Sequence, residues 1–200
     1  YYMDGSKTPF VTDTKSALFG DVILTFENKC PTGYKMSDIK GWPLLISDNP
    51  QNNVMKVYYV KDCFRYQIQH YLVGSDKPFY IEKGKSLFQS QIDSYTNKAP
   101  LGYVVDHVKG TPITIGAKES ENVMKVYYKK GTFNYTINYF KDGGTEPFTT
   151  ENLSAEFQQS ITGYPDHRPI GYKVDKVTGT PLVIGIVASK NVINVYYVKD

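Results

Sequence analysis

Alternation of large apolar and polar residues dominates this chain and recurs at a fixed interval. The run Asn122–Tyr128 (Asn-Val-Met-Lys-Val-Tyr-Tyr) alternates in this way, and close copies stand at Asn53–Tyr59 and Asn191–Tyr197, each 69 residues from the next. A fixed period of this length indicates repeated structural units. The copies align without insertion or deletion and predict three domains: repeat 1 (residues 1–61), repeat 2 (residues 62–130) and repeat 3 (residues 131–200).

The same alternation predicts the strands of each repeat. Phe133–Tyr139 places apolar or aromatic residues at every second position, the period of a half-buried strand, and Phe64–His70 repeats this pattern. A glycine turn and a second strand near Pro147-Phe148 should follow. Repeat 1 contains only Tyr1 and Tyr2 of the opening segment. We therefore expect its first strand to be truncated and its sheet to be short of a strand.

The closing run Asn122–Tyr128 should form a strand with two different faces. Met124, Val126 and Tyr128 point one way, and this face is apolar or aromatic in all three copies, so we assign it to the core. The other face carries Lys125 and should meet water. The tyrosine on that outer face is the one candidate for ligand contact, and its three copies are Tyr58, Tyr127 and Tyr196.

The middle of each repeat is ambiguous between helix and strand. Phe88, Ile92 and Tyr95 stand at i, i+4 and i+7, which lines one face of a helix, and the spacing recurs in the other copies. The equivalent run Val22–Phe26 is instead rich in β-branched residues. We predict a short helix of two or three turns, with a strand as the alternative. Repeats are joined by only about four residues, such as Lys129–Thr132, so little bending is expected and three repeats in line would form an elongated rod.

Composition narrows the class of protein. Eighteen Tyr and ten Phe supply dense aromatic packing for small repeats, and the net charge is only +3. All but two of the 23 basic residues are scattered lysines, without the arginine clusters typical of nucleic-acid interfaces. No apolar run approaches the roughly 20 residues that span a bilayer. We expect neither nucleic-acid binding nor membrane insertion.

Catalytic and metal-binding patterns are missing from the repeated positions. Residues identical in all three repeats include no His, Cys, Asp or Glu, and the three histidines stand at unrelated positions. We therefore expect no enzymatic activity, no cofactor and no metal site. Gly74 and Gly84 are interpreted as turn residues. Cys30 and Cys63 do not stand at equivalent positions, so two unpaired thiols are favoured over a disulfide bridge.

The order of motifs resembles a known class of repeats. The alternating strand, glycine turn, Pro-Phe pair, Phe-x-x-x-Ile-x-x-Tyr, Gly-Tyr followed by Gly-x-Pro, and the closing Asn-Val-x-x-Val-Tyr-Tyr together look like the MucBP (mucin-binding-protein) repeats of Gram-positive cell-surface adhesins. This resemblance covers nearly the whole chain three times. It implies an α+β, strand-dominated fold of tandem ubiquitin-like β-grasp units, each with a mixed sheet and a short helix. It also implies an extracellular, wall-anchored parent protein on the bacterial cell surface.

Three functional hypotheses follow from the residues and the resemblance. The first is a non-catalytic stalk or spacer of an adhesin, monomeric within a longer multidomain chain that begins before Tyr1. The second is direct adhesion, in which the outer tyrosines contact mucin or another host glycoprotein or glycan, because exposed Tyr presents an apolar face and a hydroxyl at low entropic cost. The third, more remote, is an accessory module of a secreted enzyme.

Overall fold

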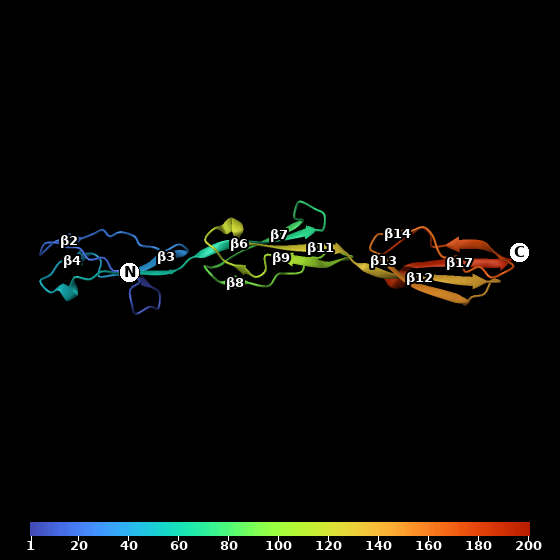
Figure 1. Ribbon diagram of the computed structural model, residues 1–200, viewed down its shortest axis with the longest axis horizontal. Helices are drawn as coiled ribbons and strands as arrows, with labels where there is room; N and C mark the ends of the chain where they lie inside the picture. The colour runs from blue at the N-terminus through green and yellow to red at the C-terminus, as the bar shows by residue number, and fades with distance from the viewer. The chain divides into compact units, whose positions relative to one another are not determined.

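The computed structural model describes residues 1–200, and strands joined by turns and loops make up the fold (Figure 1). Repeat 1 contains β1 (Tyr2–Met3), β2 (Val22–Ile23), β3 (Tyr34–Lys40), β4 (Leu44–Leu45) and β5 (Lys56–Lys61). Repeat 2 contains β6 (Cys63–Leu72), β7 (Tyr80–Leu87), β8 (Gln91–Ile92), β9 (Tyr103–Lys109), β10 (Ile113–Thr114) and β11 (Val123–Lys130). Repeat 3 contains β12 (Thr132–Lys141), β13 (Thr149–Glu156), β14 (Ser160–Ile161), β15 (Tyr172–Thr178), β16 (Leu182–Val183) and β17 (Val192–Lys199).

Helical structure is confined to three short 3-10 turns. These turns are η1 (Pro50–Asn52), η2 (Glu119–Glu121) and η3 (Ala188–Lys190), and each precedes the closing strand of its repeat. No helix of this fold has the length and apolar character needed to cross a membrane.

Contacts divide the chain into two compact units, and the division runs through repeat 2. Compact unit 1 contains residues 1–69, 81–95 and 110–124, and compact unit 2 contains residues 70–80, 96–109 and 125–200. Each unit therefore holds one terminal repeat, the connection to repeat 2 and part of repeat 2 itself.

The main sheet of repeat 3 has the strand order β13-β12-β17-β15. Its first strand β12 runs parallel to its closing strand β17 over six residue pairs, from Thr136–Val192 to Lys141–Tyr197. The outer strands β13 and β15 pair antiparallel with β12 and β17. The corresponding sheet of repeat 2 has the same order, β7-β6-β11-β9. The closing strand is therefore an inner strand in both sheets.

The inner face of each closing strand seals a core, as the alternation predicts. Tyr59, Tyr128 and Tyr197 are fully buried, and each hydroxyl accepts a hydrogen bond from a backbone N–H in a long loop of its own repeat. These donors are the backbone groups of Lys29, Lys98 and His167, at distances of 3.1, 3.0 and 3.1 Å. In each repeat, one tyrosine thus fills the core and holds the covering loop in place by a hydrogen bond.

The predicted middle helix, and with it the ubiquitin-like β-grasp unit, is wrong. After Phe88 the chain turns at Gln89, which adopts a φ of 64°, and β8 then pairs antiparallel with β10 through Ile92 and Ile113. The residues after β8 form an irregular loop up to β9. Phe88 and Ile92 make separate contacts with Gly33 and with β10 instead of lining one helix face. The helical spacing therefore came from tertiary contacts, and the fold is strand-dominated without an α-helix.

Repeat 1 differs from the other repeats in the expected way. Its main sheet has only three strands, in the order β1-β5-β3, and β1 pairs with β5 through just Tyr2–Tyr58 and Met3–Tyr59. Residues 11–18, which are equivalent to the whole of β7, form no strand. In repeat 3 the equivalent strand β13 pairs only with β12. Residues 11–18 are irregular because the strand that would pair with them is reduced to β1.

The connections between repeats are shorter than predicted, and a phenylalanine packs at each one. A single residue separates β5 from β6, and Gly131 alone separates β11 from β12. In compact unit 2, the ring of Phe157 lies against Gly102 and makes edge contacts with Tyr103 and Phe133, at centroid distances of 6.2 and 6.0 Å. In compact unit 1, the equivalent group of side chains is Phe88, Gly33, Tyr34 and Phe64.

The two cysteines are unpaired, as the sequence favours. Cys63 is exposed, whereas Cys30 is half-buried and its Sγ donates to the Tyr34 carbonyl at 3.0 Å. Burial raises the pKa of the Cys30 thiol, which keeps it protonated at neutral pH.

Candidate functional site

The outer tyrosines Tyr58, Tyr127 and Tyr196 lie on the closing strands β5, β11 and β17, on the face opposite the core. Each one stacks on an aromatic ring of the neighbouring opening strand. The pairs are Tyr58 with Tyr2, Tyr127 with Tyr71, and Tyr196 with Phe140, with centroid distances of 5.2, 5.2 and 4.9 Å. Each of these cross-strand pairs joins the closing strand of a repeat to the opening strand beside it.

Groups on the third strand approach the same tyrosines from the other side. Lys40 of β3 lies 5.3 Å from the ring centroid of Tyr58, and Lys176 of β15 lies 4.6 Å from that of Tyr196. In repeat 2 the imidazole of His107 stacks on Tyr127 at 4.4 Å, with Lys109 nearby at 5.4 Å. A cation beside an exposed aromatic ring stabilises by about 0.5–1 kcal/mol.

The outer tyrosines are therefore engaged by both neighbouring strands. All three are half-buried, and a sugar ring would have to displace Lys40, His107 or Lys176 before it could stack on an open face. The sequence prediction placed these residues on the correct face of the sheet. It did not show that their rings would already be occupied by cross-strand contacts.

An open depression of about 560 Å³ lies in compact unit 1, on the part of repeat 2 formed by β6, β7 and η2. Its rim carries Arg65, Lys83 and Lys85, with Glu119 as the acidic partner. The Arg65 backbone N–H donates to Glu119 Oε1 at 2.9 Å, which holds that carboxylate at one side. Three cations against one carboxylate favour an anionic ligand.

A glycine inside a strand makes this depression possible. Gly84 lies in the middle of β7 and not in a turn, so the turn interpretation was wrong. A Cβ at Gly84 would lie 2.4 Å from Cζ of Tyr66, so the aromatic ring occupies the space that a side chain would need. Repeat 3 has Leu153 at the equivalent position and lacks the three cations there. The sequence signal that could have indicated this depression is the pair Lys83 and Lys85, which flank Gly84.

A polar cluster in repeat 3 was also missed by sequence reasoning. The hydroxyl of the buried Tyr139 shares its one hydrogen between Glu151 Oε2 at 3.1 Å and the Pro165 carbonyl at 3.0 Å, and Glu151 Oε1 accepts from His167 Nε2 at 2.8 Å. Burial and the bond to Glu151 raise the pKa of Tyr139 far above its ordinary value. Repeat 1 contains a related ion pair, Lys29 with Asp13 at 3.8 Å. Because these bonds hold the long loop against the sheet, we assign the cluster to folding rather than to chemistry.

The chain matches no protein-family model and no curated protein. The resemblance to MucBP repeats therefore rests on the order of the sequence motifs. The residues at the site have to be interpreted from their own geometry.

Proposed function

We propose that this chain is a non-catalytic spacer that resists pulling force in the stalk of a bacterial cell-surface adhesin. The observation that carries the proposal is the parallel pairing of the first and last strands of a repeat, β12 with β17. The motif resemblance to repeats of Gram-positive surface proteins supports the extracellular, wall-anchored setting of the parent protein.

The parallel arrangement determines how a pulling force would act. The chain enters repeat 3 at the start of β12, near Thr132, and leaves it at the end of β17, near Lys199. In a parallel pair these two points lie at opposite ends of the ladder. A force between them slides the strands past each other and loads the six residue pairs together. A force that separates the strands from one end would break them one after another.

The connections between repeats suit the same role. Force leaving β11 reaches β12 through Gly131 alone, whose N–H donates to the Gly102 carbonyl at 2.8 Å and whose carbonyl accepts from Phe157 at 2.8 Å. The stacked outer tyrosines add packing between the opening and closing strands of each repeat. Their occupied faces favour a structural role over direct stacking on sugars.

Single-molecule force spectroscopy tests this proposal. The protein should unfold in discrete events, and one repeat should release about 250 Å of chain less its folded length, because an extended residue spans about 3.6 Å. Attachment through cysteines at Thr132 and Lys199 should require a higher force than attachment at Lys141 and Lys199, where one end of the ladder is opened. Cys30 and Cys63 would be replaced by serine in both proteins. Equal unfolding forces in the two geometries would refute the proposed mechanical role of the parallel strands.

A second candidate function is direct binding of an acidic host glycan in the depression bordered by Arg65, Lys83 and Lys85. The observation that favours it is the cluster of three cations around Gly84, which is absent from repeat 3. Binding to sulfated and sialylated glycans should weaken steeply with salt and disappear in the Lys83→Ala/Lys85→Ala protein. The matched control is Asn152→Ala/Ser154→Ala at the equivalent positions of repeat 3, which should bind normally.

A further inference from the structure

The outer face of the repeat 3 sheet carries a block of uncharged polar side chains. On β12 and β13 this block consists of three directly opposed pairs, which are Asn134 with Ser154, Thr136 with Asn152, and Asn138 with Thr150. On the closing strand β17, Asn194 lies opposite Asn138. We call these seven side chains the amide face. They point away from the core, because they alternate along their strands with buried residues such as Ile137 and Tyr139.

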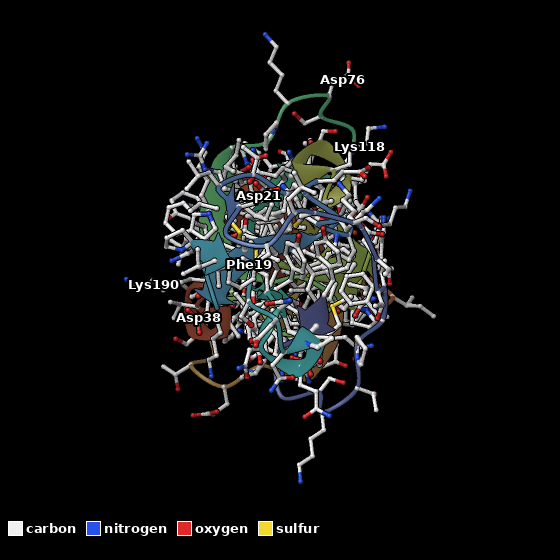
Figure 2. All side chains as sticks on the ribbon, turned by 90° about the vertical axis from the view of Figure 1, so that its left-hand side faces the viewer. Phe19, Asp21, Asp38, Asp76, Lys118 and Lys190 are labelled. Atoms are coloured by element: carbon white, nitrogen blue, oxygen red, sulfur yellow. The ribbon has the colours of Figure 1, made fainter.

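Charged side chains of repeat 3 lie outside the amide face. Glu156 stands beyond Ser154 at the end of β13, and Lys176 is on the outer strand β15. Lys190, which is labelled in Figure 2, is exposed and belongs to the turn η3 rather than to the sheet. An ionic ligand would therefore find no countercharge within the amide face, and charge complementarity favours a neutral partner.

Repeat 2 carries a different chemistry at the same positions of the fold. The residues equivalent to Asn134, Asn152 and Ser154 are Arg65, Lys83 and Lys85. These three cations are exposed, although repeat 2 has another repeat on either side. The position is therefore an open surface in a repeat with neighbours at both ends, and repeat 3 presents this surface without charge.

Hydrogen bonds within the amide face fix the orientation of most of its groups. Thr150 Oγ1 donates to Asn138 Oδ1 at 3.1 Å, and Asn138 Nδ2 donates to Asn194 Oδ1 at 3.1 Å. Thr136 Oγ1 donates to Asn152 Oδ1 at 3.2 Å. These bonds engage the side-chain oxygens of Asn152 and Asn194 and leave the NH₂ groups of both residues as donors toward solvent.

Two further side chains of the amide face make no hydrogen bond inside the protein. Asn134 and Ser154 are exposed and lie directly opposite each other on neighbouring strands. Each of them presents both a donor and an acceptor. The amide face thus offers donors and acceptors from a rigid sheet, which reduces the entropy lost when a ligand binds.

We propose that the amide face binds a neutral, extended polysaccharide chain, with a linear β-linked glucan as the ligand class. A sugar hydroxyl both donates and accepts, so it can pair with an amide or a hydroxyl in either direction. Side chains on one face of a strand recur about every 6.7 Å, so the three opposed pairs cover about 13 Å along the strands. An extended chain can follow this row, whereas a coiled chain would leave it after a short contact.

The test adds cellohexaose, a linear β-linked glucose oligomer, to the 200-residue protein labelled with nitrogen-15 and follows its NMR spectrum. The side-chain NH₂ signals of Asn134, Asn152 and Asn194 should shift as cellohexaose is added to millimolar concentration. Backbone amides of residues 63–69 and 81–87 in repeat 2 should not shift. The control ligand is maltohexaose, which has the same composition but an α-linked, coiled chain, and it should bind more weakly.

The informative variant is Asn134→Ala/Ser154→Ala. Because neither side chain has a hydrogen bond within the protein, the fold and the bonds among the remaining groups should persist, which the backbone amide spectrum checks. Each hydrogen bond lost to the ligand should weaken cellohexaose binding roughly 2- to 12-fold. The matched control is Lys83→Ala/Lys85→Ala at the equivalent edge of repeat 2, which should bind cellohexaose as the unaltered protein does.

Unchanged signals of the amide face at millimolar cellohexaose would overturn the proposal. Equal binding of maltohexaose, or undiminished binding by Asn134→Ala/Ser154→Ala, would do the same. Shifts of these signals with protein concentration in the absence of sugar would also overturn it, because a second copy of the chain would then cover the face. The proposal does not rest on the spacer role, and sugar binding is measured without force, so the two tests can fail independently.

Discussion

Replacement of a glycine at the connection between repeats should separate the stability lost through backbone strain from the stability lost through disturbed packing. Gly102 and Gly171 are equivalent residues of repeats 2 and 3, and both have a φ of 80°. A Cβ on Gly102 would lie 2.4 Å from the ring of Phe157, whereas a Cβ on Gly171 would meet no atom within 4 Å. Gly171→Ala is therefore a matched control for Gly102→Ala.

The expected losses of stability differ because only one variant disturbs a packed ring. A left-handed alanine costs about 1–2 kcal/mol, and this applies to both variants. In Gly102→Ala the Phe157 ring must also move away from Tyr103 and Phe133, and each aromatic pair contributes about 0.5–1.5 kcal/mol. We therefore expect a total loss of about 2–5 kcal/mol for Gly102→Ala and about 1–2 kcal/mol for Gly171→Ala.

Hydrogen exchange resolved by peptide is the appropriate assay, because a chain of several repeats need not unfold in one step. Each 1.4 kcal/mol raises the opening equilibrium about tenfold. In Gly102→Ala, faster exchange should reach residues 132–141 and 149–157 as well as the mutated turn. In Gly171→Ala the change should stay near residues 169–174 and Lys199. Equal losses and equal patterns in the two variants would refute the packing argument.

Three further predictions concern single side chains. Asn191→Ala should lower the stability of repeat 3 by about 2–4 kcal/mol, because Asn191 is buried and its side chain bonds both to the loop at Gly185 and to the strand at Asn134. Asn53→Ala should cost less, because Asn53 bonds only to its own loop. Hydrogen exchange measures the first loss, and fluorescence of Trp42, the only tryptophan, measures the second. Burial and the bond to a neighbouring carboxylate raise the pKa of Tyr197 to about 12. This pKa lies above the value of about 10 in the unfolded chain, so the neutral hydroxyl stabilises the fold fully below pH 10, and this stabilisation is lost as the pH rises through about 12. Spectrophotometric titration of tyrosine combined with circular dichroism should detect the loss. The Tyr197→Phe variant should lack this pH-dependent step. Tyr127→Ala should cost about 1–3 kcal/mol in urea unfolding through loss of its two ring contacts, with no loss of glycan binding; lost binding with intact stability would instead restore the adhesion role of this residue.

Local patterns in the sequence predicted the strands well. Alternation of apolar and polar residues identified the opening and closing strands and assigned Tyr128 and Tyr197 to the core, because side chains on a strand alternate between its two faces. The same pattern placed Tyr127 on the outer face. It did not reveal the rings of Tyr71 and His107 on either side, since strand order brings those residues together from distant parts of the chain.

The middle segment shows where local patterns fail. Phe88, Ile92 and Tyr95 have helical spacing, yet Phe88 packs on Gly33 of the preceding repeat and Ile92 pairs with β10. Periodicity reports only that residues are buried at certain intervals, and it cannot distinguish one common surface from several separate partners. Gly84 is a similar case, because its place inside β7 depends on the ring of Tyr66 across the sheet.

The sequence by itself determined the threefold repeat, the opening and closing strands and the shortened opening strand of repeat 1, because each follows from residue order alone. Only the tertiary structure decided the parallel pairing of first and last strands, the absence of an α-helix, and the contacts that surround the outer tyrosines. The physical reason is that pairing and burial are properties of residues brought together from far apart in the chain.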